Sequence, residues 1–249
     1  MNEILLILLG VLVGVLSSFL GFGGGTIMVP LLPWIAGYDI KTAVATSLAV
    51  IGLNAANNVR SFQKEKLIRW KMILTMACGS ILMAALCSRM TSLIPEFWTH
   101  IAIILIFSLV AYMTYFGPQV VPRFLREFNL RNQILGGVAA GAVSGLTGIG
   151  GGTILVPLFL VGGWTKNEEV SPNGNAINMV TAASGALILF LSRNMISLEA
   201  VGLILAGSVV SAHFCRKKQK LLSESLRRKS IVIYLGSIVI LQIYELVKT

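Results

Sequence analysis

Long apolar segments separated by short polar connections run along the whole chain. Most approach the roughly 20 residues that a helix needs to cross a bilayer, so the pattern predicts an all-α integral membrane protein. Two segments, 26–37 and 153–164, hold only about a dozen residues. At about 1.5 Å per residue they cannot cross a hydrocarbon core of about 30 Å. The other predicted helical segments are 4–20, 42–59, 72–88 and 98–116 in the first half, and 133–147, 173–192, 198–214 and 231–246 in the second.

Each short segment follows a cluster of glycines, within a sequence that occurs twice. Residues 21–32 read GFGGGTIMVPLL and residues 148–159 read GIGGGTILVPLF, so nine of twelve positions are identical at an offset of 127. Farther along, Gly79-Ser80 matches Gly207-Ser208 at an offset of 128. Two matches at nearly one offset predict a tandem duplication, as in many transporters. We expect repeat 1 at 1–120, a linker at 121–131 and repeat 2 at 132–249.

Composition supports a membrane protein, and the distribution of charge adds an orientation. Hydrophobic residues make up 55% of the chain and charged residues 12%, far below the roughly 25% of soluble domains. The net charge of +10 is concentrated in the connections 60–71, 123–131 and 216–229, which carry +4, +2 and +6. Basic loops between apolar segments mark the cytoplasmic face, so we expect a multi-pass protein of the cytoplasmic membrane, in contact with the lipid bilayer and with no nucleic-acid partner.

The three basic connections lie on one side only if the chain crosses the membrane an even number of times between them. Between 131 and 216 the spans 173–192 and 198–214 already give an even number, so the segment 133–164 must cross the membrane zero times or twice. Its short second piece favours zero, so that the chain enters and leaves by the same face. We therefore predict two re-entrant hairpins, 4–37 and 133–164, each followed by three transmembrane helices. Because three is odd, the repeats are inverted relative to each other, which is typical of secondary transporters.

The glycine breaks in these hairpins are candidate anion sites. A helix that begins inside a membrane presents free N–H groups and the positive end of its dipole to the gap. The alternative is that the glycines only allow close helix packing. Two clusters, each followed by threonine and then by proline four residues later, favour a functional break. The candidate substrate-binding residues are Gly23, Gly24, Gly25 and Thr26 in repeat 1 and Gly150, Gly151, Gly152 and Thr153 in repeat 2.

The spans that follow the hairpins contain polar residues where apolar ones would be expected. Neutral amides and hydroxyls donate hydrogen bonds to anions, although they equally serve as bonds between helices. Spacing of four and eight residues places several of them on one helical face. We expect the walls of the site to include Thr46, Ser47 and Asn54 from one span and Asn173, Asn175, Asn178 and Thr181 from the other.

Other kinds of site chemistry lack candidates. His100 and His213 stand alone, the three cysteines form no CxxC pair, and no Asp or Glu is deep in a predicted span. We therefore expect no catalytic residue, no metal and no cofactor. Arg60, Arg89 and Arg193 are expected to reach from segment ends to the interface, or, as an alternative, to attract anions at an entrance. The first apolar segment has only Glu3 before it and lacks the basic region of a signal peptide.

The two glycine-rich sequences resemble those of the TauE/SafE family of sulfite and organosulfur-anion exporters. The resemblance covers nearly the whole chain, because it includes the duplicated halves, the short length and Thr46-Ser47-Leu48 after the first glycine cluster. It implies passage of small sulfur-containing anions across a prokaryotic cytoplasmic membrane. In repeat 2 the equivalent of Thr46-Ser47-Leu48 is Asn173-Gly174-Asn175, so the two sides of the site differ.

The leading interpretation is a secondary transporter of a small oxyanion such as sulfite or a sulfonate, bound between the hairpin tips. The sequence is compatible with a homo-oligomer. A protonated substrate such as bisulfite could itself carry the proton, since no buried carboxylate is available. The alternatives are a carrier of another small anion, an intramembrane enzyme, which would need a histidine near Ser144 or Ser184, and a cation carrier, which would need clustered acidic, His or Cys ligands.

Overall fold

The computed structural model describes residues 2–91, 94–193 and 196–248, and this part of the chain forms a bundle of helices without strands. The first half contains α1 (Asn2–Leu20), α2 (Gly25–Ala36), α3 (Ile40–Lys64), α4 (Trp70–Thr91) and α5 (Glu96–Phe116). The linker contains η1 (Gly117–Gln119) and α6 (Arg123–Arg126). The second half contains α7 (Leu130–Thr147), α8 (Gly152–Val161), α9 (Asn167–Arg193), α10 (Leu198–Cys215), η2 (Arg216–Leu221) and α11 (Glu224–Lys248).

The prediction of an all-α membrane protein is confirmed. Among the described residues α1, α4, α5, α9 and α10 are long and apolar enough to cross a membrane. The perimeter of the bundle is apolar as well, with Leu74 62% exposed and Leu191 71% exposed. Large apolar side chains on the outside fit a protein whose solvent is lipid.

Two helix pairs fold back on themselves at the glycine clusters. Gly21, Gly23 and Gly24 have φ values of 84°, 81° and 80°, and Gly148 and Gly150 have values of 71° and 91°. Residues with a Cβ rarely adopt this left-handed region, so glycine is required for the chain to leave α1 and α7 and reverse direction. The helices after the breaks, α2 and α8, are short and apolar.

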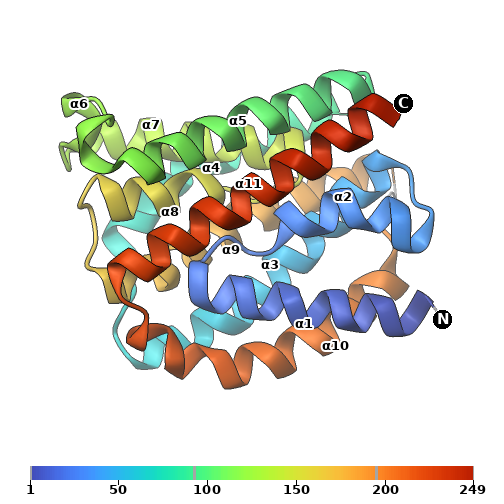
Figure 1. Cartoon of the computed structure of the whole chain (residues 1–249), viewed down its shortest axis with the longest axis horizontal. Helices are drawn as coiled ribbons and strands as arrows, with labels where there is room; N and C mark the ends of the chain where they lie inside the picture. The colour runs from blue at the N-terminus through green and yellow to red at the C-terminus, as the bar shows by residue number, and fades with distance from the viewer. Residues whose placement is uncertain (1, 92–93, 194–195, 249) are drawn as a thin grey trace.

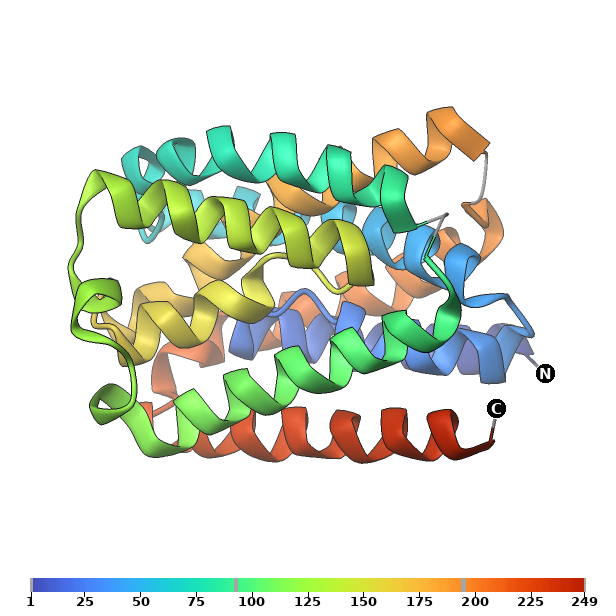
Figure 2. The same cartoon turned by 90° about the horizontal axis from the view of Figure 1, so that it is seen from above.

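The two hairpins enter the bundle from opposite ends. In Figure 1 and Figure 2, α1 and α7 run inward from opposite ends, and α2 and α8 each return toward the end from which the hairpin came. Their glycine-rich tips meet in the middle of the bundle, where an added Cβ on Gly25 would lie 2.8 Å from the carbonyl oxygen of Gly148.

The two halves exchange packing partners. The first helix of each hairpin packs along a long helix of the other half, α1 along α10 and α7 along α4, while α3 pairs with α9 and α5 with α11. Small residues allow this approach, because a Cβ added to Gly10 or Gly137 would lie 2.1 Å from the carbonyl oxygen of Ile204 or Met76, respectively. Close backbone contact of this kind is the usual basis of helix association in membranes.

The three basic connections lie together. The connections before α4, around α6 and before α11 all occur at the end of the bundle opposite the two termini (Figure 1). An ion pair between Lys220 and Glu65 joins two of them, and Asn167 at the start of α9 donates to the carbonyl oxygen of Leu222. This arrangement is the one that the positive-inside rule requires of loops on a common side.

Candidate functional site

The two tips interlock so tightly that only glycine fits at the first position of each short helix. A Cβ on Gly152 would lie 2.7 Å from the carbonyl oxygen of Gly21, just as one on Gly25 would lie 2.8 Å from that of Gly148. Real Cβ atoms do not approach a carbonyl oxygen this closely. All eight predicted tip residues are buried, so the site is closed on both sides in this conformation.

The N-terminus of α8 is capped by side chains of α9. The amide of Gly152 donates to Oδ1 of Asn178 at 2.7 Å, and the amide of Gly151 donates to Oγ1 of Thr181 at 3.3 Å. Asn178 Nδ2 in turn donates to the carbonyl oxygen of Gly21 at 2.9 Å. Asn178 therefore ties both tips together, and the first free N–H groups of α8 already have partners.

The N-terminus of α2 has no such cap. At the offset of 127 the equivalent of Asn178 is Ile51, whose side chain lies against Gly23 and Gly25 and offers no acceptor. The amides of Gly25 and Thr26 have no hydrogen-bond partner among the described residues. The positive end of α2 is thus buried and unsatisfied, which is the usual setting of an anion site at a helix N-terminus.

Asn54 is a predicted site residue whose side-chain amide the structure leaves without a partner. It is fully buried one turn beyond Ile51 on α3, at the position equivalent to Thr181, and both of its side-chain polar atoms lack a hydrogen bond. Buried amides are nearly always bonded, so an unpaired one calls for an explanation such as a ligand.

The two tip threonines also differ. The hydroxyl of Thr26 contacts that of Tyr234 on α11, whereas the hydroxyl of Thr153 is buried without a partner. At the same offset the equivalent of Tyr234 is Phe107, which has no hydroxyl to offer. Repeat 2 therefore has a free side-chain donor at its tip and repeat 1 has free backbone donors.

Ser47 and Thr46 contact the other half of the protein. Ser47 Oγ donates to the carbonyl oxygen of Gly148 at 2.7 Å, and Thr46 Oγ1 accepts from the amide of Ser197 at 3.2 Å. The first contact belongs to the tips, since it satisfies the carbonyl that lies beside Gly25. The second holds the beginning of α10.

Asn173 and Asn175 have partners outside the gap between the tips. Asn173 accepts from the amide of Arg69 at 2.9 Å and donates to the carbonyl oxygen of Leu67 at 3.2 Å, so it orders the connection between α3 and α4. Asn175 bonds the side chain and carbonyl of Ser17 at 2.7 and 2.8 Å, near the end of α1. Their placement near the start of α9 separates them from Asn178 and Thr181, which reach the tips.

Arg227 does not stand out in the sequence, because it lies within the basic connection 216–229, where solvent-exposed cations are expected. The structure buries it completely, and it donates to the carbonyl oxygen of Phe19, to Asn167 and to Gln219. No carboxylate is among these partners. Burial lowers the pKa of Arg227 to about 10, so the group remains cationic at neutral pH near the C-terminal end of α1. A signal was present, since Arg227 shares a helical face with Ile231, Leu235 and Ile238.

A cavity of about 500 Å³ lies between the C-terminal half of α3, the start of α4 and α9. Its lining includes Asn57, Arg60 and Gln63 of α3, Trp70 of α4 and Met179, the neighbour of Asn178 on α9. Arg60 is exposed, and Nδ2 of Asn57 is buried without a partner. The cavity therefore begins near the basic end of the bundle and approaches the site residues of α9.

Metal chemistry finds no support in the part of the chain that the structure describes, where no group of three His, Cys, Asp or Glu side chains could hold an ion. Cys78, Cys87 and Cys215 form no disulfide with one another. The polar groups that do converge are amides, hydroxyls and backbone N–H groups, which suit an anion.

Comparison with known proteins agrees with this chemistry. The family model described as sulfite exporter TauE/SafE matches residues 6–242. A probable membrane transporter protein of Methanocaldococcus jannaschii is 31% identical over 76% of this chain and 73% of its own. The probable membrane transporter protein YjnA of Bacillus subtilis is 28% identical over 84% of this chain and 90% of its own. No solved structure matches significantly.

The family match covers nearly the whole chain and includes both glycine-rich tips. It agrees with the helical, apolar-surfaced bundle. The chain is therefore a membrane transporter that belongs to the TauE/SafE family of sulfite exporters.

Proposed function

We propose that the protein is a secondary transporter of a small sulfur-containing oxyanion, sulfite or a sulfonate, bound between the two hairpin tips. The observations that carry the proposal are the uncapped N-terminus of α2 and Asn54, a fully buried amide with no partner one turn beyond Ile51 on α3. The family's description as sulfite exporters supports the substrate class.

The tip of repeat 1 offers the donors that such an anion needs. The amides of Gly25 and Thr26 and Nδ2 of Asn54 are donors without partners, and the dipole of α2 adds positive potential in surroundings of low dielectric. A negative oxygen accepts from all three groups. The free Oδ1 of Asn54 accepts from a hydroxyl, which favours a protonated form such as bisulfite as the bound species.

The closed tips require a movement before the anion can enter. Hairpins that enter from opposite ends and repeats that exchange helices fit alternating access by rocking of one unit against the other. The cavity lined by Arg60 is a candidate entrance at the basic end, because the positive charge of Arg60 attracts anions. Transport would follow from opening the tips alternately toward this cavity and toward the opposite end.

The test is sulfite flux into or out of proteoliposomes, with Asn54→Leu as the decisive variant. Replacing an unpaired buried amide with an apolar group of similar size is neutral or stabilising, so the protein should fold with an unchanged or higher Tm. If Asn54 binds substrate, flux falls at least tenfold all the same. Normal flux together with a raised Tm would mean that Asn54 lowers stability and takes no part in transport. That result would overturn the proposed binding site.

A matched control separates binding from folding. Asn175→Leu removes an amide with several bonds to Ser17 and Ser171, so it should lower Tm, and the flux per folded molecule should change little. Competition by sulfonate, thiosulfate and phosphate in the same assay distinguishes sulfur oxyanions from other small anions.

A further inference from the structure

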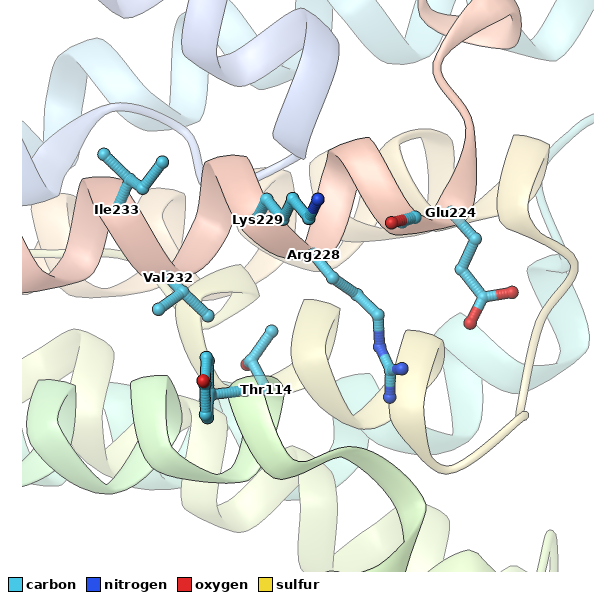
Figure 3. A pocket seen from close by; sticks show the side chains of 8 residues that line it. Thr114, Glu224, Arg228, Lys229, Val232 and Ile233 are labelled. Carbon is cyan, nitrogen blue, oxygen red and sulfur yellow. The ribbon is translucent and has the colours of Figure 1, made fainter.

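We infer that a pocket between α5 and α11 binds the phosphate of an anionic phospholipid. The pocket has a volume of about 570 Å³ and lies far along the bundle from the glycine tips, where the last turn of α5 faces the first turns of α11. Its lining includes Thr114 and Tyr115 of α5 and Arg228, Lys229, Val232 and Ile233 of α11 (Figure 3).

Arg228 supplies the first reason. Its side chain points from α11 toward α5 (Figure 3), and Nε and Nη2 of its guanidinium are buried without any hydrogen-bond partner. Nη2 packs over Gly117 at the end of α5, where a Cβ would lie 2.5 Å away. Buried cationic donors without partners are rare, and the planar guanidinium matches the two oxygens of a phosphate.

The charged side chains that line the pocket indicate the charge of its ligand. Lys229 adds a second cation and Glu224 an anion, so the pocket has a net charge of +1. This suits a phosphodiester, which has one negative charge. Arg228 and Lys229 belong to the basic connection 216–229, which lies at the same end of the bundle as the other two basic connections (Figure 1).

The apolar half of the pocket distinguishes a lipid from a soluble anion. One turn after Arg228 and Lys229 on α11, the pocket is lined by Val232 and Ile233. Ile233 is 72% exposed on the outside of the bundle. Tyr112, Tyr115 and Phe116 form an exposed aromatic cluster at this level of α5, as is typical of a membrane interface. A headgroup in the pocket would therefore let its acyl chains run along the exposed face of α11, as at basic lipid sites between helices in other membrane proteins.

A bound lipid would bridge the last long helices of the two halves. Arg228 and Lys229 belong to α11 and Tyr115 to α5, and these two helices pack against each other. The inference is independent of the transported substrate, because none of these residues belongs to the tips.

The experiment measures binding of phosphatidylglycerol to the purified full-length protein in detergent, by native mass spectrometry and by the shift in Tm. Phosphatidylcholine and inorganic phosphate serve as comparison probes. We expect phosphatidylglycerol to bind and raise Tm, and the other two probes to have little effect. Arg228→Gln should weaken phosphatidylglycerol binding at least tenfold and Lys229→Gln about threefold.

Arg131→Gln is the matched control, since it removes one exposed cation outside the pocket. It should change the affinity less than twofold. Equal effects of phosphatidylglycerol and phosphatidylcholine, protection by inorganic phosphate alone, or unchanged binding in both pocket variants would overturn the inference. If Arg228→Gln does not fold, Lys229→Gln alone decides the outcome.

Discussion

The two hairpin tips share a sequence and a reversal of the chain, but they differ in chemistry. They also differ in backbone at one position, since φ is 80° at Gly24 and −68° at its equivalent Gly151. At the tip of repeat 2, Asn178 and Thr181 cap the first amides of α8, whereas at the tip of repeat 1, Ile51 stands in place of Asn178 and the amides of α2 stay free. Asn54, at the place of Thr181, is buried with no partner. The comparison teaches that two copies of one sequence meet different neighbouring side chains, so the first amides of α8 are bonded and those of α2 are free.

Asn178→Leu should have the largest effect on stability. It leaves the amide of Gly152 and the carbonyl of Gly21 buried without the bonds that now satisfy them. We expect a loss of on the order of 3 kcal/mol in the free energy of unfolding, because each buried polar group left unpaired costs about 1–3 kcal/mol. Unfolding in detergent micelles measures it. A loss no larger than that caused by Asn54→Leu would contradict the asymmetry of the tips.

Gly25→Ala and Gly152→Ala should destabilise the protein to similar extents. Each places a methyl group against a carbonyl oxygen of the opposite tip, and overpacking of this kind costs about 1–3 kcal/mol. We expect similar losses of stability because each added Cβ would lie at nearly the same distance, 2.8 or 2.7 Å, from a carbonyl oxygen of the opposite tip. Gly202→Ala on α10 is the control, since nothing lies near its Cβ. Comparison of the three Tm values in one detergent checks this, and a harmless Gly25→Ala would mean that the tips are not in contact.

Ile51→Asn should make repeat 1 resemble repeat 2. The new amide can accept from Gly25 as Asn178 does from Gly152, so it competes with a bound anion. We expect about tenfold weaker sulfite binding, which corresponds to about 1.4 kcal/mol. Ile51→Leu preserves the volume and should leave the affinity unchanged. Equal affinity in both variants, measured by calorimetry on the purified protein, would place the anion elsewhere.

The smallest effect concerns the tip threonines. Thr26→Val removes the bond to Tyr234 and should cost about 1 kcal/mol of stability. Thr153→Val removes a hydroxyl that has no partner, so the free energy of unfolding should change by less than about 0.5 kcal/mol or rise slightly. Chemical denaturation of the two variants side by side gives the difference. If both cost the same, the two threonines are bonded alike.

Several features were predictable because they depend on local sequence. The length of apolar segments predicts membrane helices. Glycine clusters predict breaks, since glycine readily adopts the left-handed backbone seen at Gly21, Gly23 and Gly150, which other residues rarely adopt. The offset of 127 also pairs Ile51 with Asn178, and these two side chains lie beside both tips. Burial of Asn54 likewise agrees with the prediction of a polar residue inside a span.

Other features depended on partners distant in sequence. Asn173 and Asn175 are polar residues of the same span as Asn178, yet they bond Arg69 and Ser17 because α9 begins beside the α3–α4 connection and the end of α1. Arg227 belongs by composition to a basic loop, but packing of α11 brings it against Phe19. The spacing of polar residues predicts which face of a helix is polar. It does not predict which other helix or loop packs against that face.

By itself the sequence determined that this chain is a duplicated, all-helical membrane protein broken twice by glycines, because hydrophobic length and backbone freedom are properties of short stretches of residues. The tertiary structure decided which helices the halves exchange and which of two similar tips keeps its amides free. That choice depends on the side chain across the gap, Ile51 or Asn178, and therefore on how α3 and α9 pack. Burial gives this difference its energetic weight. A backbone amide exposed to water bonds to water, whereas a buried amide without a partner has a cost in free energy that a ligand could remove.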